Sequence, residues 1–129
     1  MPTEKIIILE DSKAVAKRTA EIFVEAIRKK PNIVLGLPTG ETFIPVYREI
    51  VKLYKKKKVS FTGVRTFNLD EFYGLKLEDK RSLRNYMDKN FFKKVNLKRE
   101  NIYFLNGGAK GWKKECEGYE REIKKVGGI

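Results

Sequence analysis

The sequence predicts an α/β fold with a mostly parallel, doubly wound sheet. Short apolar runs rich in Ile, Val and Leu alternate along the chain with longer segments whose apolar residues recur at helical spacing. Strands that alternate with helices in this way build parallel sheets through right-handed crossovers, with helices on both faces. The length of 129 residues corresponds to one domain or to part of one.

The first half of the chain contains two predicted strand–helix pairs. Residues 5–9 are a β-branched run that predicts a strand, and residues 13–28 carry apolar side chains on one helical face. Residues 33–37 form a continuous apolar run of the kind found in strands buried on both faces. A second helix is predicted to start near Thr42, and the lysines that cluster at its end suit the helix dipole.

The second half continues the alternation. Residues 64–69 predict a third strand, residues 86–92 a short helix, and residues 102–105 a fourth strand. Residues 112–126 predict a charged helix. A strand followed by a helix is therefore expected four times, which is a Rossmann-like arrangement.

The end of the chain has the pattern of an interrupted domain. Gly127-Gly128-Ile129 resembles a helix C-cap followed by the first residue of another strand. We therefore expect residues 1–129 to be the amino-terminal part of a single domain, truncated before its later strands. Such a chain would expose sheet edge and apolar helix faces, which favours a homo-oligomer or a complementing chain as partner.

The composition is strongly basic and limits the available chemistry. Lys and Arg total 29 against 17 Asp and Glu, which gives a formal net charge of +12. With one cysteine and no histidine, the sequence excludes internal disulfides, His-based catalytic triads and the common zinc ligand sets. The apolar run at residues 6–9 is too short for a signal peptide or a membrane span, so we expect a cytoplasmic protein without a membrane partner. Four consecutive lysines, residues 55–58, are more typical of a solvated helix end than of a nucleic-acid site, because no aromatic side chains are interleaved with them.

The first candidate binding segment is Thr39, Gly40, Glu41 and Thr42, between a predicted buried strand and a helix N-terminus. In an open α/β sheet, ligands bind at the carboxyl ends of the strands. Free backbone N–H groups and the helix dipole form an anion site at such a place, most naturally for phosphate. The alternative is a tight strand-to-helix turn with Thr42 as the helix cap. The segment is not a P-loop, because the lysine of that pattern is absent.

The second candidate segment holds Asp70 and Glu71, two adjacent carboxylates at the end of the strand predicted at residues 64–69. Successive strand residues face opposite ways, so the two acids are not expected to share one role. If this strand lies one or two places from the one at residues 33–37, its end lies about 5 to 10 Å from the anion loop. That separation suits a sugar phosphate, because a carboxylate beside its carbonyl end can move a proton between neighbouring carbons. The alternative roles are helix capping and a surface ion pair.

Several segments together resemble a known family. The resemblance is carried by LGLPTGETFIPVY, VSFTGVRTFNLDEFYGL, NYMDKNFFKKVNL, ENIYFLNG and ECEGYEREIKKVGGI. In this order they are similar to the first half of glucosamine-6-phosphate deaminases, sugar-phosphate isomerases that are also related to 6-phosphogluconolactonases.

The resemblance implies an activity and roles for particular residues. The implied reaction, part of amino-sugar catabolism, converts glucosamine 6-phosphate to fructose 6-phosphate and ammonia, with no metal or organic cofactor. Asp70 matches the family's general base and Glu71 is its motif neighbour, so both are expected at the catalytic site. Residues 39–42 match the phosphate loop. The implied partner is a small-molecule sugar phosphate, with no nucleic acid.

Departures from the family pattern leave other readings open. Glu41 beside a phosphate is repulsive unless its side chain points outward or pairs with a lysine. The family continues past Ile129 into a loop that supplies a ring-opening histidine, so little activity is expected from this chain alone. A 6-phosphogluconolactonase-type hydrolase and a non-catalytic sugar-phosphate sensor are the alternatives, because a fold can be kept while its chemistry changes.

Overall fold

The computed structural model describes residues 4–129. Within that range the chain forms four α-helices and one three-stranded sheet: α1 (Ser12–Lys29), β1 (Val34–Leu37), α2 (Ile44–Lys55), β2 (Arg65–Asn68), α3 (Leu83–Asn90), β3 (Ile102–Tyr103) and α4 (Trp112–Lys125). The strand order is β1-β2-β3, and both neighbouring pairs are parallel. The predicted α/β fold with a parallel sheet is confirmed.

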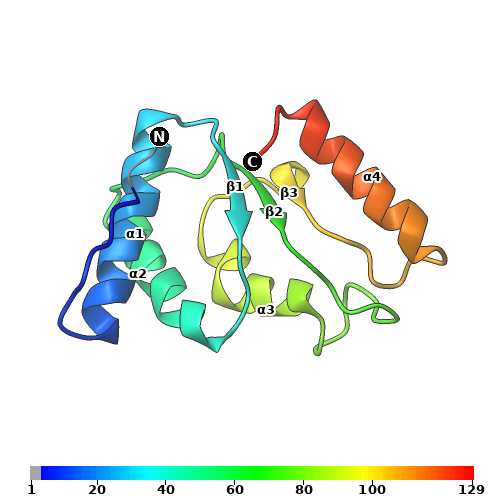
Figure 1. The fold of residues 1–129 in the computed structure, drawn as a ribbon, viewed down its shortest axis with the longest axis horizontal. Helices are drawn as coiled ribbons and strands as arrows, with labels where there is room; N and C mark the ends of the chain where they lie inside the picture. The colour runs from blue at the N-terminus through cyan, green and yellow to red at the C-terminus, as the bar shows by residue number, and fades with distance from the viewer. Residues whose placement is uncertain (1–3) are drawn as a thin grey trace.

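The helices cover both faces of the sheet. Helices α1 and α2 lie on one side, α4 lies on the other, and α3 lies at the end toward which the strand arrows point (Figure 1). Leu37 of β1 belongs to the core beneath α1 and α2. Gly36 and its register partner Phe67 face the opposite side, where the Phe67 ring meets Tyr119 of α4 at a centroid distance of 5.5 Å. The sheet is therefore doubly wound, as the alternating pattern predicts.

The larger core lies on the side of α1 and α2. Helix α1 begins after Asp11, whose side chain accepts a hydrogen bond from the Ala14 amide at 2.7 Å. The buried residues of the two helices are Ala16, Ala20, Val24 and Ile27 in α1 and Val46, Tyr47, Ile50 and Val51 in α2. The ring of Tyr47 stacks on Phe91 at 5.2 Å, and Phe61 meets Phe91 edge-on at 5.3 Å. Because each such side chain contributes about 1.5 to 3 kcal/mol when fully buried, this aromatic group joins α2, the end of α3 and the segment that leads into β2.

The side covered by α4 is thinner. Phe67 stacks on Tyr103 with centroids 4.4 Å apart. The Tyr119 hydroxyl donates to the carbonyl oxygens of Asn68 and Tyr103 at 2.7 and 3.2 Å. No residue of α4 is buried, and Trp112 at its start is 61% exposed. Helix α4 is therefore attached through a few aromatic contacts rather than through a packed apolar face.

The strand predicted at residues 5–9 is wrong. These residues precede α1 without regular secondary structure and pair with no strand in the described part of the chain. Ile6 and Ile8 are 83% and 90% exposed. A β-branched run has the propensity for a strand, but the strand forms only where a sheet edge and a buried face are available to it.

Other element boundaries differ by a few residues. The helix predicted at residues 86–92 begins earlier, at Leu83, because the Ser82 hydroxyl caps it by accepting from the Asn85 amide at 3.0 Å. The fourth predicted strand keeps only Ile102–Tyr103. None of the helices in residues 4–129 combines the length and the apolar character that a membrane crossing requires.

Candidate functional site

Two loops leave the same edge of the sheet. Leu37 and Asn68, the last residues of β1 and β2, are register partners in neighbouring parallel strands. The Asn68 side chain donates from Nδ2 to the Leu37 carbonyl at 2.9 Å and ties the two strand ends together. We call residues 38–43 the glycine loop and residues 69–82 the acid loop. Because neighbouring strands lie about 4.8 Å apart, the two loops start side by side.

The glycine loop makes a sharp turn before α2. Gly40 has φ 109°, in the left-handed region that favours glycine. A 3₁₀ turn over Glu41–Phe43 follows, and its first hydrogen bond runs from the Phe43 amide to the Gly40 carbonyl at 3.2 Å. The alternative role for Thr42 as the helix cap is wrong, because α2 starts at Ile44 and neither turn nor helix is capped by a side chain.

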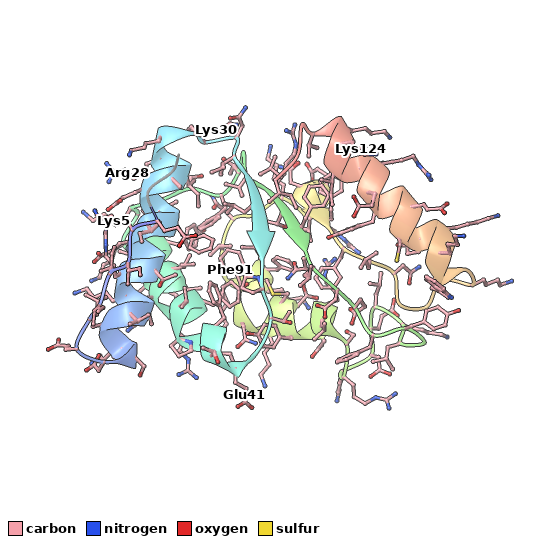
Figure 2. All side chains as sticks on the ribbon, in the orientation of Figure 1. Lys5, Arg28, Lys30, Glu41, Phe91 and Lys124 are labelled. Carbon is pink, nitrogen blue, oxygen red and sulfur yellow. The ribbon has the colours of Figure 1, made fainter. Side chains whose placement is uncertain are left out.

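The predicted anion-binding residues lie at the surface. Gly40, Glu41 and Thr42 are exposed and Thr39 is half-buried. Figure 2 shows Glu41 at the end of the molecule opposite to that of Arg28 and Lys30. The loop therefore opens to solvent at the carboxyl end of the sheet, where an anion can approach its backbone.

Two tyrosines that sequence reasoning missed hold the glycine loop from beneath. The Tyr47 hydroxyl donates to the Pro38 carbonyl at 2.5 Å, and the Tyr86 hydroxyl donates to the Gly40 carbonyl at 2.5 Å. Burial raises the pKa of Tyr47 well above its usual range and also raises the pKa of Tyr86, so both hydroxyls stay protonated at neutral pH. The one sequence signal for Tyr47 is its place on the inward face of α2.

The two acids of the acid loop have different surroundings. Asp70 is exposed at the start of the loop. The Glu71 carboxylate accepts hydrogen bonds from the amides of Leu83 and Arg84 at 2.7 and 2.9 Å, and from the amide of Phe72 at 2.9 Å. Glu71 thus caps the N-terminus of α3, where a negative charge also interacts favourably with the helix dipole. The Asp70 carboxylate, in contrast, has no hydrogen-bond or ion-pair partner within residues 4–129 and faces solvent.

The acid loop is also fastened to the turn after β3. The Gly74 amide donates to the Gly107 carbonyl at 2.7 Å. A side chain at Gly107 would meet the Phe72 carbonyl at 2.2 Å, so only glycine fits there. A cavity of about 380 Å³ lies beside this contact, lined by Glu71, Tyr73, Leu105, Asn106, Trp112 and Cys116 among others. The Asn-Gly-Gly turn therefore positions the acid loop.

Polar atoms beneath the two loops are not all paired. The Thr66 hydroxyl oxygen and the Asn68 Oδ1 are buried and have no hydrogen-bond partner among the described residues. Thr66 and Asn68 are 0% and 3% exposed and lie two residues apart on the same face of β2. Within residues 4–129, no group of three or more His, Cys, Asp or Glu side chains is placed to hold a metal ion.

A family profile matches almost the whole chain. The profile describes glucosamine-6-phosphate isomerases and 6-phosphogluconolactonase, and it matches residues 10–128. The match includes both loops and all seven helices and strands given above.

Individual relatives agree with the profile. Glucosamine-6-phosphate deaminase 1 of Giardia intestinalis is 48% identical over 112 residues, which cover 87% of this chain and 42% of the relative. Glucosamine-6-phosphate deaminase of Thermoanaerobacter sp. is 42% identical over 125 residues, covering 97% of this chain and 49% of the relative. The chain thus spans about half the length of the curated relatives it matches.

Solved structures share the fold. A structure described as a monomeric glucosamine-6-phosphate deaminase of the NagB superfamily superposes with a TM-score of 0.94 at 32% identity, over 98% of this chain and 52% of that chain. A 6-phosphogluconolactonase from Thermotoga maritima superposes with a TM-score of 0.75 at 24% identity, over 93% of this chain and 53% of that chain. The second likeness extends to the fold alone.

Proposed function

The chain belongs to the family of glucosamine-6-phosphate isomerases and 6-phosphogluconolactonase, and from this membership we propose that it supplies the phosphate loop and the general base of a glucosamine-6-phosphate deaminase. The deaminase is favoured over the lactonase because relatives named as deaminases are 42% to 48% identical. The proposed ligand is an amino-sugar phosphate, held by the glycine loop and transformed beside the acid loop.

One observation carries the proposal: β1 and β2 are parallel neighbours that end in register at Leu37 and Asn68. The glycine loop and Asp70 therefore start at the same edge of the sheet. Phosphate binds at residues 39–42 through backbone N–H groups, which suit an anion near a helix start. The carbon chain of the opened sugar then extends toward Asp70.

Asp70 is the group proposed to move the proton. It removes the proton from C2 of the open-chain sugar, and a proton is returned to C1. The C1 oxygen gains a second proton and the C2 amine loses one, so the C1 aldehyde becomes an alcohol and the C2 amine becomes an imine. One water molecule then hydrolyses the imine, leaving a ketone at C2 and releasing ammonia. A positioned base contributes about 10²- to 10⁴-fold to such a step. Glu71 supports this site through its bonds to α3.

The partner chain belongs to the same proposal. The sequence contains no histidine, so the histidine that opens the sugar ring in the family pattern comes from a complementing chain that carries the second half, or from further sequence. A second copy of this chain is the alternative partner, and the mass of the complex in solution distinguishes a homo-oligomer from a complex with the second half.

The test is an assay of ammonia and fructose 6-phosphate released from glucosamine 6-phosphate. The chain is assayed alone and after mixing with the separately produced carboxyl-terminal half of the Thermoanaerobacter relative, with 6-phosphogluconolactone as the competing substrate. The expected result is that the mixture releases ammonia and fructose 6-phosphate, whereas the chain by itself does not. Turnover of the lactone only would replace the deaminase with the lactonase, and ligand binding without turnover in either sample would favour the sensor.

A further inference from the structure

Two tyrosine hydroxyls converge on one short stretch of backbone. Tyr47 of α2 bonds the Pro38 carbonyl and Tyr86 of α3 bonds the Gly40 carbonyl. The two rings pack edge to face with centroids 6.5 Å apart. The carbonyls of Pro38 and Gly40 therefore both point toward one aromatic pair beneath the glycine loop.

The direction of these carbonyls fixes the direction of the neighbouring amides. A trans peptide is planar, and its N–H points opposite to its C=O. The amides of Thr39 and Glu41, which belong to the same two peptides, therefore point away from the tyrosine pair. Neither amide donates a backbone hydrogen bond within residues 4–129. We infer that Tyr47 and Tyr86 are positioning residues for the phosphate site, which aim the Thr39 and Glu41 amides at the ligand.

The inference rests on the proposed function, which assigns the glycine loop to the sugar phosphate. Its physical basis is the freedom of Gly40, which has φ 109° and lacks the side chain that restricts other residues. The peptide between Gly40 and Glu41 can flip, and the flipped form turns a carbonyl oxygen toward the phosphate. The hydrogen bond from the Tyr86 hydroxyl opposes this flip, because the flipped Gly40 carbonyl would lose this donor.

Both hydroxyls keep the required proton over a wide pH range. Burial raises the pKa of Tyr47 and, less strongly, the pKa of Tyr86. The ring of Tyr47 is 0% exposed and stacks on Phe91. Replacement by phenylalanine removes the hydroxyl and keeps the ring, so Tyr47→Phe and Tyr86→Phe separate the hydrogen bond from the packing.

The experiment titrates the whole chain with inorganic phosphate and with glucosamine 6-phosphate. Affinity is measured by calorimetry, and the amide resonances of residues 39–42 are followed by NMR. The variants are Tyr47→Phe, Tyr86→Phe and both together. The matched control is Tyr54→Phe, since Tyr54 lies at the other end of α2 and its ring packs against Phe61 at 6.3 Å. A thermal melt of each variant monitors folding.

The expected result is a selective loss of affinity. The dissociation constant for both ligands rises about three- to tenfold for each single variant, the change that one hydrogen bond supplies. In the unaltered chain, phosphate shifts the amide resonances of Thr39 and Glu41 most. Tyr54→Phe leaves the affinity unchanged even if its melting temperature falls as much as those of the other variants.

Two results would overturn the inference and they are distinguishable. If the unaltered chain binds both ligands and the Tyr47 and Tyr86 variants bind them equally well, the tyrosines do not position the site, while the proposed phosphate loop stands. If the unaltered chain binds neither ligand, both this inference and the proposed phosphate loop fail. They also fail if phosphate shifts only the amide resonances of the lysines at residues 55–58.

Discussion

The glycine loop and the acid loop start side by side but are fixed in opposite ways. The glycine loop is held by its backbone, because the carbonyls of Pro38 and Gly40 accept hydrogen bonds from tyrosines. The acid loop has a backbone bond from Gly74 to Gly107, but it is held to α3 by a side chain, because the Glu71 carboxylate accepts backbone N–H groups at the start of that helix. A loop whose carbonyls are hydrogen-bonded to the protein leaves its amides available to a ligand. A loop that is held through the Glu71 carboxylate leaves the neighbouring acid, Asp70, available.

The comparison predicts where substitutions matter. Changes of Asp70 and Glu71 in the acid loop should have large effects, since Glu71 supports the loop and the proposed function assigns the proton transfer to Asp70. Side-chain changes within the glycine loop should have small effects, since the proposed function assigns ligand binding to its backbone.

The largest effect is expected from Asp70→Asn. An amide cannot take the C2 proton, so we expect kcat for glucosamine 6-phosphate to fall about 10²- to 10⁴-fold, measured in the mixture with the second half. Phosphate affinity should stay unchanged, because the glycine loop is intact. The matched control is Asp79→Asn, in which an acid of the same loop that pairs with Arg81 at 2.8 Å is neutralised. Retained turnover in Asp70→Asn would remove Asp70 from the role of base.

Glu71→Ala should have the next largest effect, on stability. It leaves the amides of Leu83 and Arg84 without their acceptor, and the free energy of unfolding should fall by about 1 to 3 kcal/mol in urea. Glu71→Gln keeps one acceptor oxygen and should lose less. The control is Asp11→Ala at the start of α1, which removes a single exposed cap and should cost about 0.5 to 2 kcal/mol.

The Glu71→Gln variant also tests whether Glu71 takes part in the proposed proton transfer. If Glu71 only caps α3, turnover by Glu71→Gln should follow its remaining stability and keep the pH profile of the unaltered protein. A changed pH profile at full folding would give Glu71 a direct part in proton transfer and would break the contrast between the two acids.

Sequence patterns located both loops because local signals specify them. A buried apolar run followed by Pro, Thr and Gly marks the end of β1, and two acids after the next run mark the end of β2. The helix-capping alternative for the acid pair is confirmed for Glu71. Such signals depend only on residues that are close in the sequence, so they do not require knowledge of contacts with distant parts of the chain.

The supports of the loops could not be predicted in this way. Tyr86 lies 46 residues from Gly40, and no local pattern pairs a tyrosine with a distant carbonyl. The strand expected at residues 5–9 failed for a related reason, since strand formation depends on a sheet edge elsewhere in the chain. Contacts between distant residues set both outcomes.

A smaller effect is expected at the surface of the glycine loop. Glu41 is exposed, so Glu41→Gln should tighten phosphate binding by about two- to threefold at low salt, and the gain should shrink as salt screens the charge. Thr42→Val is the companion variant and should change the affinity by less than about threefold, since one hydroxyl contact at an exposed site is weak. Titration of inorganic phosphate at two salt concentrations measures both. A tenfold or larger change would show that side chains of the glycine loop bind the ligand, contrary to the contrast drawn between the two loops.

The smallest effect is expected from Thr66→Val, beneath both loops. The Thr66 hydroxyl is buried without a partner among the described residues, and valine has nearly the same shape. The free energy of unfolding should therefore stay the same or rise by up to about 1 kcal/mol, because an unpaired polar group is removed from the interior. Thr66→Ser, which keeps the hydroxyl and loses the methyl group, should instead be destabilising by about 1 kcal/mol. If Thr66→Val were the destabilised variant, the hydroxyl would have a partner, and it would add a second polar link near the ends of β1 and β2 to the one that the Asn68 side chain makes to the Leu37 carbonyl.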